Sequence, residues 1–120
     1  MSEQVIERLG CTARYADATI CNGLVHAVEV PASEEGDIAS QTQSLLDALE
    51  RTLIAARSGK HCLLMATVYL VDMADYDGMN VEWERWLTTG TAPARACVKV
   101  AGLARPGWRV EVAVTAATIA

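Results

Sequence analysis

The sequence predicts an α+β fold in which a single mixed β-sheet carries two helices on one of its faces. Two stretches of the chain have apolar residues at helical spacing, and five shorter stretches are rich in apolar and β-branched residues. These segments follow one another in the order β-β-α-β-α-β-β, which is typical of a sheet covered by a helical layer. The chain has 120 residues and neither a repeat nor a linker, so one domain spanning 1–120 is predicted.

The first half of the chain is predicted to form a hairpin followed by a long helix. Ala18–Asn22 and Leu24–Val30 have the composition of strands, and Asn22-Gly23 between them tolerates the positive φ of a tight turn. Asp37 is a suitable cap for the helix, which Ser58–Gly59 ends. One face of this helix is an apolar stripe at three- and four-residue steps: Ile38, Thr42, Leu45, Leu46, Leu49 and Leu53.

The second half is predicted to contain three strands and a shorter helix. The strands are expected at Leu63–Val71, Ala94–Val100 and Trp108–Ala117. A helix over Tyr76–Leu87 is predicted between the first two of them, with Asp75 as its cap. Its tryptophans, Trp83 and Trp86, share one helical face, and we expect packing or rim positions for them, not a ligand cage. Two β-α-β crossovers imply right-handed connections, which put both helices on the same face of the sheet.

A partner subunit is expected to cover the sheet face that has no helix. Apolar residues make up 52% of the chain, which is a high share for a monomer of this size. Large exposed apolar faces usually mark interfaces, so the pattern favours a self-associating trimer or dimer.

Charge and motif content exclude several classes of function. The formal charge is −5 and the basic residues are scattered, which argues against nucleic acid as a partner. No stretch approaches the roughly 20 apolar residues of a membrane span. Metal-site, nucleotide-binding and serine-hydrolase motifs are absent, so no metal ligands are predicted. Four cysteines without CxxC spacing are typical of reduced thiols and favour a cytoplasmic protein: Cys11, Cys21, Cys62 and Cys97.

Two charged residues of the last two strands are candidates for a site. Strand alternation places Arg95 and Cys97 on one side of their strand and Glu111 on the non-valine side of the next. A guanidinium binds a carboxylate through two parallel hydrogen bonds, and a carboxylate can orient a water molecule for attack. The residues alone also allow, and favour, a plainer interpretation, which is an ion pair at a subunit interface.

Several segments, taken together, resemble one protein family. They run from about Tyr15 to the last strand and keep a common order: Gln41–Asp47, Ala66–Tyr76, Met79-Asn80 with Trp83 and Trp86, Ala92–Val98, Gly102-Leu103 and Val110–Val112. The most specific combination is a Pro-Ala-Arg segment followed by a Val-Glu-Val strand. In these segments the chain resembles the Rid/YjgF family of reactive-intermediate deaminases.

The resemblance implies a chorismate-mutase-like fold, a homotrimer, and clefts at the subunit interfaces. It also implies hydrolysis of reactive 2-imino or 2-enamino acids to 2-oxo acids and ammonia, without a metal or an organic cofactor. The arginine that matches Arg95 would hold the substrate carboxylate, with help from the backbone N–H of Cys97. The acid that matches Glu111 would position the attacking water, and the tyrosine that matches Tyr15 would line the same cleft.

Two positions depart from the family pattern where the site is expected. A strand that usually contains Ser-Gly-Gln before its proline is Ala27-Val28-Glu29-Val30-Pro31 here. Val28 therefore replaces a glycine, and a branched side chain there is expected to narrow the site and to disfavour bulky substrates. Glu29 adds a negative charge. These departures keep a second hypothesis open, in which the trimer binds small carboxylates without catalysis.

Overall fold

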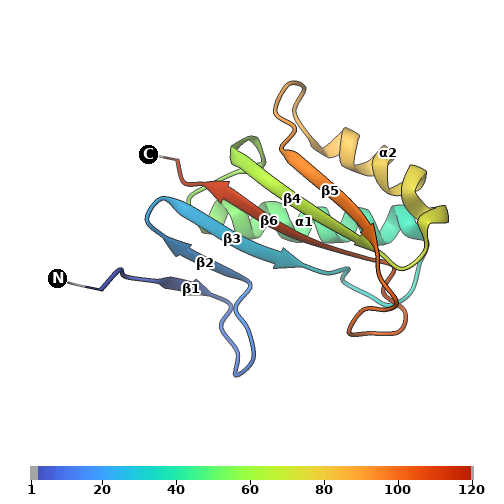
Figure 1. Cartoon of the computed structure of the whole chain (residues 1–120), viewed down its shortest axis with the longest axis horizontal. Coiled ribbons are helices and arrows are strands. Elements are labelled where there is room, and N and C mark those ends of the chain that lie inside the picture. The colour runs from blue at the N-terminus through green and yellow to red at the C-terminus, as the bar shows by residue number, and fades with distance from the viewer. Residues whose placement is uncertain (1–2, 120) are drawn as a thin grey trace.

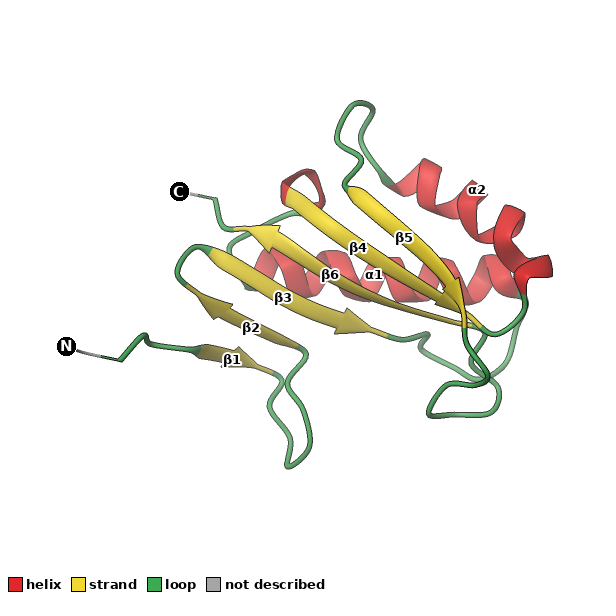
Figure 2. Ribbon diagram, in the orientation of Figure 1, coloured by secondary structure: helices red, strands yellow, loops and turns green. Residues whose placement is uncertain are grey.

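The computed structural model describes residues 3–119. In chain order the elements are β1 (Glu7–Leu9), β2 (Ala18–Cys21), β3 (Leu24–Glu29), α1 (Ile38–Ala55), β4 (Leu63–Leu70), α2 (Tyr76–Trp86), β5 (Ala94–Lys99) and β6 (Val110–Ala117), with 3₁₀ turns η1 (Lys60–Cys62) and η2 (Met73–Asp75) before β4 and α2. Figure 1 shows α1 running behind the strands and α2 lying at the edge that β5 forms. Figure 2 separates this helical layer from the sheet by colour. Within the described residues, no helix is long and apolar enough to cross a membrane.

The six strands form one mixed sheet in the order β1-β2-β3-β6-β4-β5. Only β4 and β5 pair in parallel, and all the other neighbours are antiparallel. Because β3 and β4 both flank β6 in antiparallel fashion, they run in the same direction, as the first crossover predicts. The predicted α+β class and the order of the elements are confirmed.

One strand was not predicted. β1 adds three residues to the edge of the hairpin, with Glu7 opposite Ile20 and Leu9 opposite Ala18. It is too short and too polar to show an alternating pattern. An ion pair between Arg57 Nη2 and Glu7 Oε1, 3.0 Å long, connects it to the end of α1.

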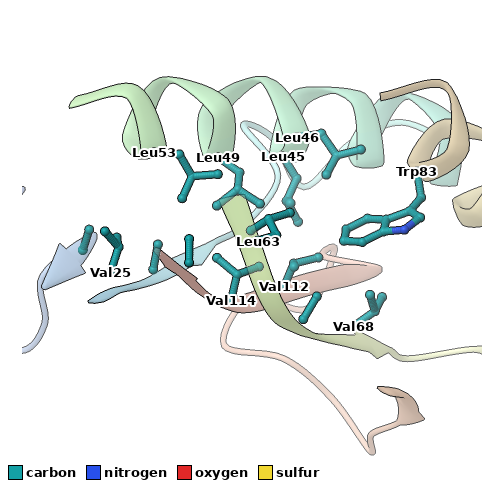
Figure 3. Packing of buried hydrophobic residues seen from close by; sticks show 14 of the residues in the cluster. Val25, Leu45, Leu46, Leu49, Leu53, Leu63, Val68, Trp83, Val112 and Val114 are labelled. Atoms are coloured by element: carbon teal, nitrogen blue, oxygen red, sulfur yellow. The ribbon is translucent and has the colours of Figure 1, made fainter. Parts of the chain in front are cut away.

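The long helix covers the middle of the sheet with its predicted apolar stripe. Asp37 caps it as expected, since its carboxylate accepts a hydrogen bond of 2.9 Å from the N–H of Ser40. Leu45, Leu49 and Leu53 are fully buried, and burial of each such side chain stabilises the fold by roughly 1.5–3 kcal/mol. Figure 3 shows these leucines above the valines of the sheet, with Trp83 closing one end of the core.

The short helix packs through its tryptophans, and Asp75 occupies its N-cap position, as predicted. Trp83 is 5% exposed, and the ring of Trp86 lies 5.7 Å from it at the rim of the core, so the predicted packing is confirmed. Asp75 precedes the helix, yet its side chain makes no capping hydrogen bond. Its carboxylate pairs with Arg109 instead, at 3.2 Å between Oδ2 and Nη1.

The helices cover one face of the sheet and leave the other face exposed. On β6, Val110, Val112 and Val114 are buried beneath the helices, while Glu111 and Ala113 alternate with them on the other side. We refer to that other side as the open face. It carries apolar side chains that are between 38% and 45% exposed: Leu24, Met65, Val98 and Val28. An exposed apolar surface of this kind is typical of an interface.

Candidate functional site

Glu111 lies on the open face of the sheet, near the start of β6. Its position follows from alternation, because both neighbouring residues, Val110 and Val112, point into the core. The strand register places Glu111 opposite Tyr69 of β4. The carboxylate is therefore carried by a central strand with a partner strand on each side, which is a rigid support for a functional group.

A hollow of about 340 Å³ opens beside this carboxylate, and we refer to it as the Glu111 hollow. Three parts of the chain build it: the segment between β1 and β2, the end of β3, and the loop that leads into β6. Its lining residues are Tyr15, Ala16, Asp17, Val28, Glu29, Val30, Ala104, Trp108 and Glu111. The structure thus brings together Tyr15 and Glu111, two of the residues expected at the site, although they are 96 positions apart in the sequence.

The two departures from the family pattern also line this hollow. Val28 is 45% exposed on the open face, so its branched side chain occupies space that a glycine would leave free. Glu29 alternates with it, and its Oε1 accepts a hydrogen bond of 2.7 Å from Thr52 Oγ1 of α1. Burial raises the pKa of Glu29, with Asp17 nearby acting in the same direction, while the Thr52 hydrogen bond opposes the shift.

Arg95 lies on the opposite face of the sheet from Glu111. Its strand pairs with β4 so that Arg95 is level with Ala66, which is fully buried under the helices. The guanidinium stands 5.5 Å from the ring of Trp83 and 6.0 Å from the ring of Tyr76, at distances typical of cation–π contacts. Among residues 3–119, no acid pairs with Arg95. Its Nη1 and Nη2 make long contacts, at 3.9 Å with Met79 Sδ and at 3.5 Å with Tyr76 Oη, which an anion can replace.

Cys97 follows Arg95 on the same side of β5. The register sets it level with Val68, and its side chain is partly buried against the core. Burial raises the pKa of the Cys97 thiol, and the nearby Arg95 charge opposes that shift only in part. A raised thiol pKa disfavours the nucleophilic thiolate, and the side chain packs against the core.

One chain alone does not bring Arg95 and Glu111 together. Side chains alternate in each strand as predicted. The register of β4 with its two neighbours, however, places the side of β5 that carries Arg95 beneath the helices, and the side of β6 that carries Glu111 on the open face. The hollow around Glu111 contains no lysine or arginine. A site that uses both residues therefore requires a second copy of the chain.

The structure adds residues that the sequence did not single out. Trp108 and Ala104, from the loop before β6, form one wall of the Glu111 hollow, and Asp17 also lines it. The only signal for Trp108 is its place in a Pro-Gly-Trp turn three residues before Glu111. In residues 3–119, no group of three or more His, Cys, Asp or Glu is arranged to hold a metal ion.

Comparisons with known proteins show the family to which the chain belongs. The family described as Endoribonuclease L-PSP matches residues 5–118. A RutC family protein of Haemophilus ducreyi is 41% identical over 114 residues, which cover 94% of this chain and 97% of that protein. The RutC family protein YoaB of Escherichia coli is 35% identical over 112 residues, 93% of this chain and 97% of its own.

Solved structures extend the likeness to three dimensions. The crystal structure of a YjgF family member from Neisseria meningitidis superposes with a TM-score of 0.93 at 41% identity, and the match covers 97% of both chains. A putative translation initiation inhibitor from Salmonella typhimurium gives a TM-score of 0.86 at 34% identity, covering 94% of this chain and 97% of that one. The chain therefore belongs to the YjgF/RutC family, the family described as Endoribonuclease L-PSP.

Proposed function

We propose that the protein hydrolyses reactive 2-imino and 2-enamino acids to 2-oxo acids and ammonia, in clefts between copies of the chain. The observation that carries the proposal is the shared hollow of Tyr15 and Glu111, the two residues that the family resemblance assigns to a cleft. Arg95 supports it independently, because its guanidinium is braced by aromatic rings and has no acid partner in the described chain.

The proposed reaction depends more on the orientation of substrate and water than on chemical activation of the substrate. Arg95 holds the substrate carboxylate through two hydrogen bonds, and the backbone N–H of Cys97 adds a third. Glu111 accepts a proton from a water molecule as its oxygen attacks the carbon of the C=N bond. Glu111 returns this proton to the nitrogen, which gives the carbinolamine. The hydroxyl proton of the carbinolamine then passes to the nitrogen, the C–N bond breaks, and ammonia leaves as the C=O bond forms. An imine is already electrophilic, so positioning of water and substrate supplies much of the rate.

The cleft requires self-association, and we propose a homotrimer. Arg95 and Glu111 occupy opposite faces of one sheet, so a second copy must supply one of them. The open face offers the surface for it, since Val28, Met65 and Val98 are exposed there. Light scattering at micromolar concentration is expected to give three times the mass of the chain, and a monomer would contradict the proposal.

The cytoplasm is the compartment that we propose for this activity. The four cysteines are free thiols, and Cys11 is exposed. Exposed and half-buried thiols of this kind persist in reducing compartments.

A second candidate function is non-catalytic binding of a small carboxylate by the same trimer. Val28 favours it, because a half-exposed branched side chain lines the Glu111 hollow where the family pattern has a glycine. The overall charge does not favour RNA as a substrate. The chain has a formal charge of −5, whereas proteins that bind nucleic acids present a clustered basic surface to the phosphates.

A coupled assay separates catalysis from binding. An amino-acid oxidase generates an imine in the presence of semicarbazide, which traps whatever imine remains. Purified protein is expected to lower the initial rate of semicarbazone formation, because the 2-oxo acid product reacts with semicarbazide more slowly than the imine does, and Glu111→Gln is expected to abolish the effect. If wild-type protein leaves the initial rate unchanged, hydrolysis is excluded for that imine. Calorimetric titration with the matching 2-oxo acid then tests the binding function.

A further inference from the structure

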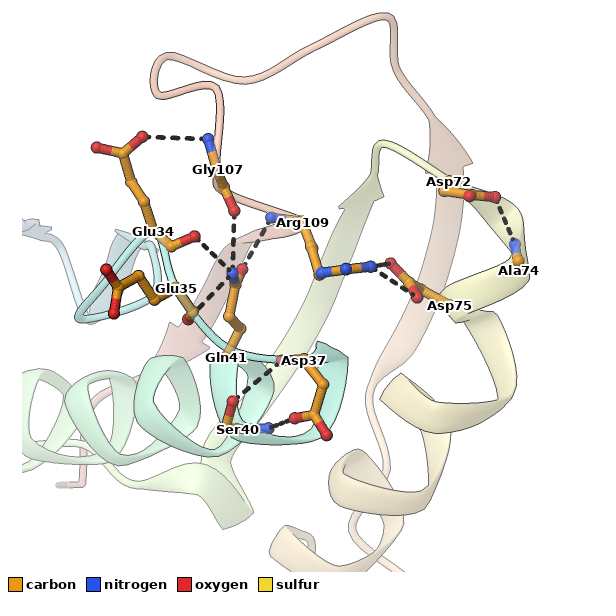
Figure 4. Close-up of polar contacts among 10 residues, drawn as sticks. All are labelled: Glu34, Glu35, Asp37, Ser40, Gln41, Asp72, Ala74, Asp75, Gly107 and Arg109. Atoms are coloured by element: carbon orange, nitrogen blue, oxygen red, sulfur yellow. Dashed lines mark hydrogen bonds and ion pairs between the residues drawn. The ribbon is translucent and has the colours of Figure 1, made fainter.

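Gln41 has a buried side chain whose amide makes hydrogen bonds through both its nitrogen and its oxygen. It does not line the Glu111 hollow. It stands in the first turn of α1 and is 2% exposed. Its Nε2 donates to the carbonyl oxygen of Gly107 at 2.9 Å. The same nitrogen lies 3.4 Å from the carbonyl oxygens of Glu34 and Glu35. On its other side, Oε1 accepts the backbone N–H of Arg109 at 2.8 Å. Figure 4 shows the amide at the centre of these four contacts.

The identity of this residue follows from what surrounds it. Three carbonyl oxygens on one side require a donor, and one N–H on the other requires an acceptor. Only a primary amide of this reach supplies both, which also fixes the orientation of the Gln41 side chain. A buried carbonyl or N–H left without its partner carries a desolvation cost, so the contacts tie the segments together firmly.

Other contacts tighten the same junction. The N–H of Gly107 donates to Glu34 Oε1 at 3.1 Å, and a Cβ at Gly107 would come within 2.5 Å of the Glu34 carbonyl oxygen. Close backbone approach of this kind explains a glycine at that position. Arg109 is held in turn by the carboxylate of Asp75, at 3.2 Å between Nη1 and Oδ2.

The residues bonded to Gln41 flank one wall of the candidate site. Gly107 and Arg109 are the neighbours of Trp108, whose side chain lines the Glu111 hollow. Arg109 directly precedes β6, and Glu111 follows it by two positions, as the second residue of that strand. A side chain in α1 thereby fixes both the wall of the hollow and the point at which β6 begins.

We infer that Gln41 is a positioning residue for the site, which acts through Trp108 and Glu111 without contacting the substrate. The inference rests on the proposed function for its kinetic consequence. Its structural part, that Gln41 sets the place of the Trp108 wall, stands independently. Displacement of that wall changes the fit of the substrate, so it raises KM as well as lowering kcat.

The test compares Gln41→Met with a matched control, Ser58→Ala. Ser58 is 4% exposed, and its Oγ donates to the carbonyl oxygen of Ala117 at 2.6 Å, at the far end of β6. Both changes remove buried hydrogen bonds, so both lower the melting temperature. Only Gln41→Met is expected to lower kcat/KM for imine hydrolysis, by about tenfold to a hundredfold, because misplacement by about 1 Å has effects of that size. Loss of folded protein alone would lower apparent kcat and leave KM unchanged.

A second measurement reports on the wall directly. In protein labelled with 5-fluorotryptophan, the ¹⁹F resonance of Trp108 is assigned by its loss in Trp108→Phe. This resonance is expected to shift in Gln41→Met and to keep its place in Ser58→Ala. If Gln41→Met does not fold, Gln41→Asn, which shortens the amide by one methylene, replaces it.

The outcomes distinguish the inference from the proposed function. A shifted Trp108 resonance with a raised KM supports the positioning role. An unshifted resonance overturns it, whatever the kinetics show. A shifted resonance with wild-type KM and kcat in an active protein overturns it as well. If the wild-type protein hydrolyses no imine, the proposed function fails, and the ¹⁹F spectra still decide whether Gln41 holds the wall.

Discussion

The placement of Arg95 and Glu111 on opposite faces of one sheet leads to a quantitative expectation for mixed oligomers. The register of β4 with both neighbours fixes these faces, so no rotation of side chains brings the two residues into one cleft within a chain. The perturbation is a pair of inactive variants, Arg95→Ala and Glu111→Gln. Each lacks one half of the proposed site and keeps the other half.

The expected activity of the mixture follows from counting. In an equimolar, randomly assembled oligomer, a cleft is intact when its arginine comes from a Glu111→Gln chain and its glutamate from an Arg95→Ala chain. The chance of this is about one in four, so the mixture recovers about a quarter of the wild-type activity. If each cleft drew both residues from one chain, no cleft would ever be intact, and the mixture would be as inactive as its components.

The assay requires mixing before assembly. Both variants are unfolded together, refolded, and checked by light scattering for the mass of the wild-type oligomer. Imine hydrolysis is then measured against each variant refolded by itself. Activity near a quarter of wild type, well above either component, is expected. Mixed oligomers of correct mass without recovered activity would refute the reasoning from sheet faces, because they would require Arg95 and Glu111 to act within one chain or not at all.

Three further predictions concern single residues. Arg95→Ala is expected to lower kcat/KM by about two to three orders of magnitude, and Arg95→Lys nearly as much. The free energy of unfolding of Arg95→Ala is expected to fall by only about 1–2 kcal/mol, because the contacts with Trp83 and Tyr76 are lost. An Arg95→Ala variant that is stable and fully active would remove Arg95 from the site. Val28→Gly is expected to raise the rate on leucine-derived imine relative to alanine-derived imine, and an unchanged ratio would count against a narrowing role. Burial raises the pKa of Glu29 above its ordinary value of 4.5. The protonated Glu29 therefore stabilises the fold below pH 4.5, and this contribution is lost as the pH rises through the raised pKa. Glu29→Gln is therefore expected to melt higher than wild type at pH 7 and to lose this advantage at pH 4, whereas equal melting at both pH values would contradict the assignment.

Much of the fold was predictable because local patterns and packing agree. The apolar stripe of α1 has the period of a buried helix face, and Asp37 supplies the cap that such a helix needs. At Asn22-Gly23 both residues have positive φ, as the hairpin requires. Strand ends differ from the prediction by one or two residues, mostly at positions where pairing stops but the composition stays apolar.

The site was less predictable, because strand alternation says which side chains share a side of one strand and nothing about its neighbours. Relating Arg95 to Glu111 requires the register across β5, β4 and β6, which depends on the whole sheet. Trp108 lies in a loop without periodicity, and the hydrogen bonds that Gln41 makes with this loop join residues 66 and 68 positions apart in the sequence. The assignment of Tyr15 came from family resemblance alone, since its own neighbourhood in the sequence has no distinguishing pattern.

The central place of β6 has a consequence for how the protein is made. The ribosome releases this strand after all the others, yet it alone joins β3 to β4. Until then the growing chain contains two separate pieces of sheet, whose apolar edges and faces have nothing to cover them. Contacts such as that between Val25 and Ala116 close loops of about 90 residues, and such long-range closure slows folding. Assembly of the sheet therefore waits for β6, and the strands made before it are exposed to aggregation until it arrives.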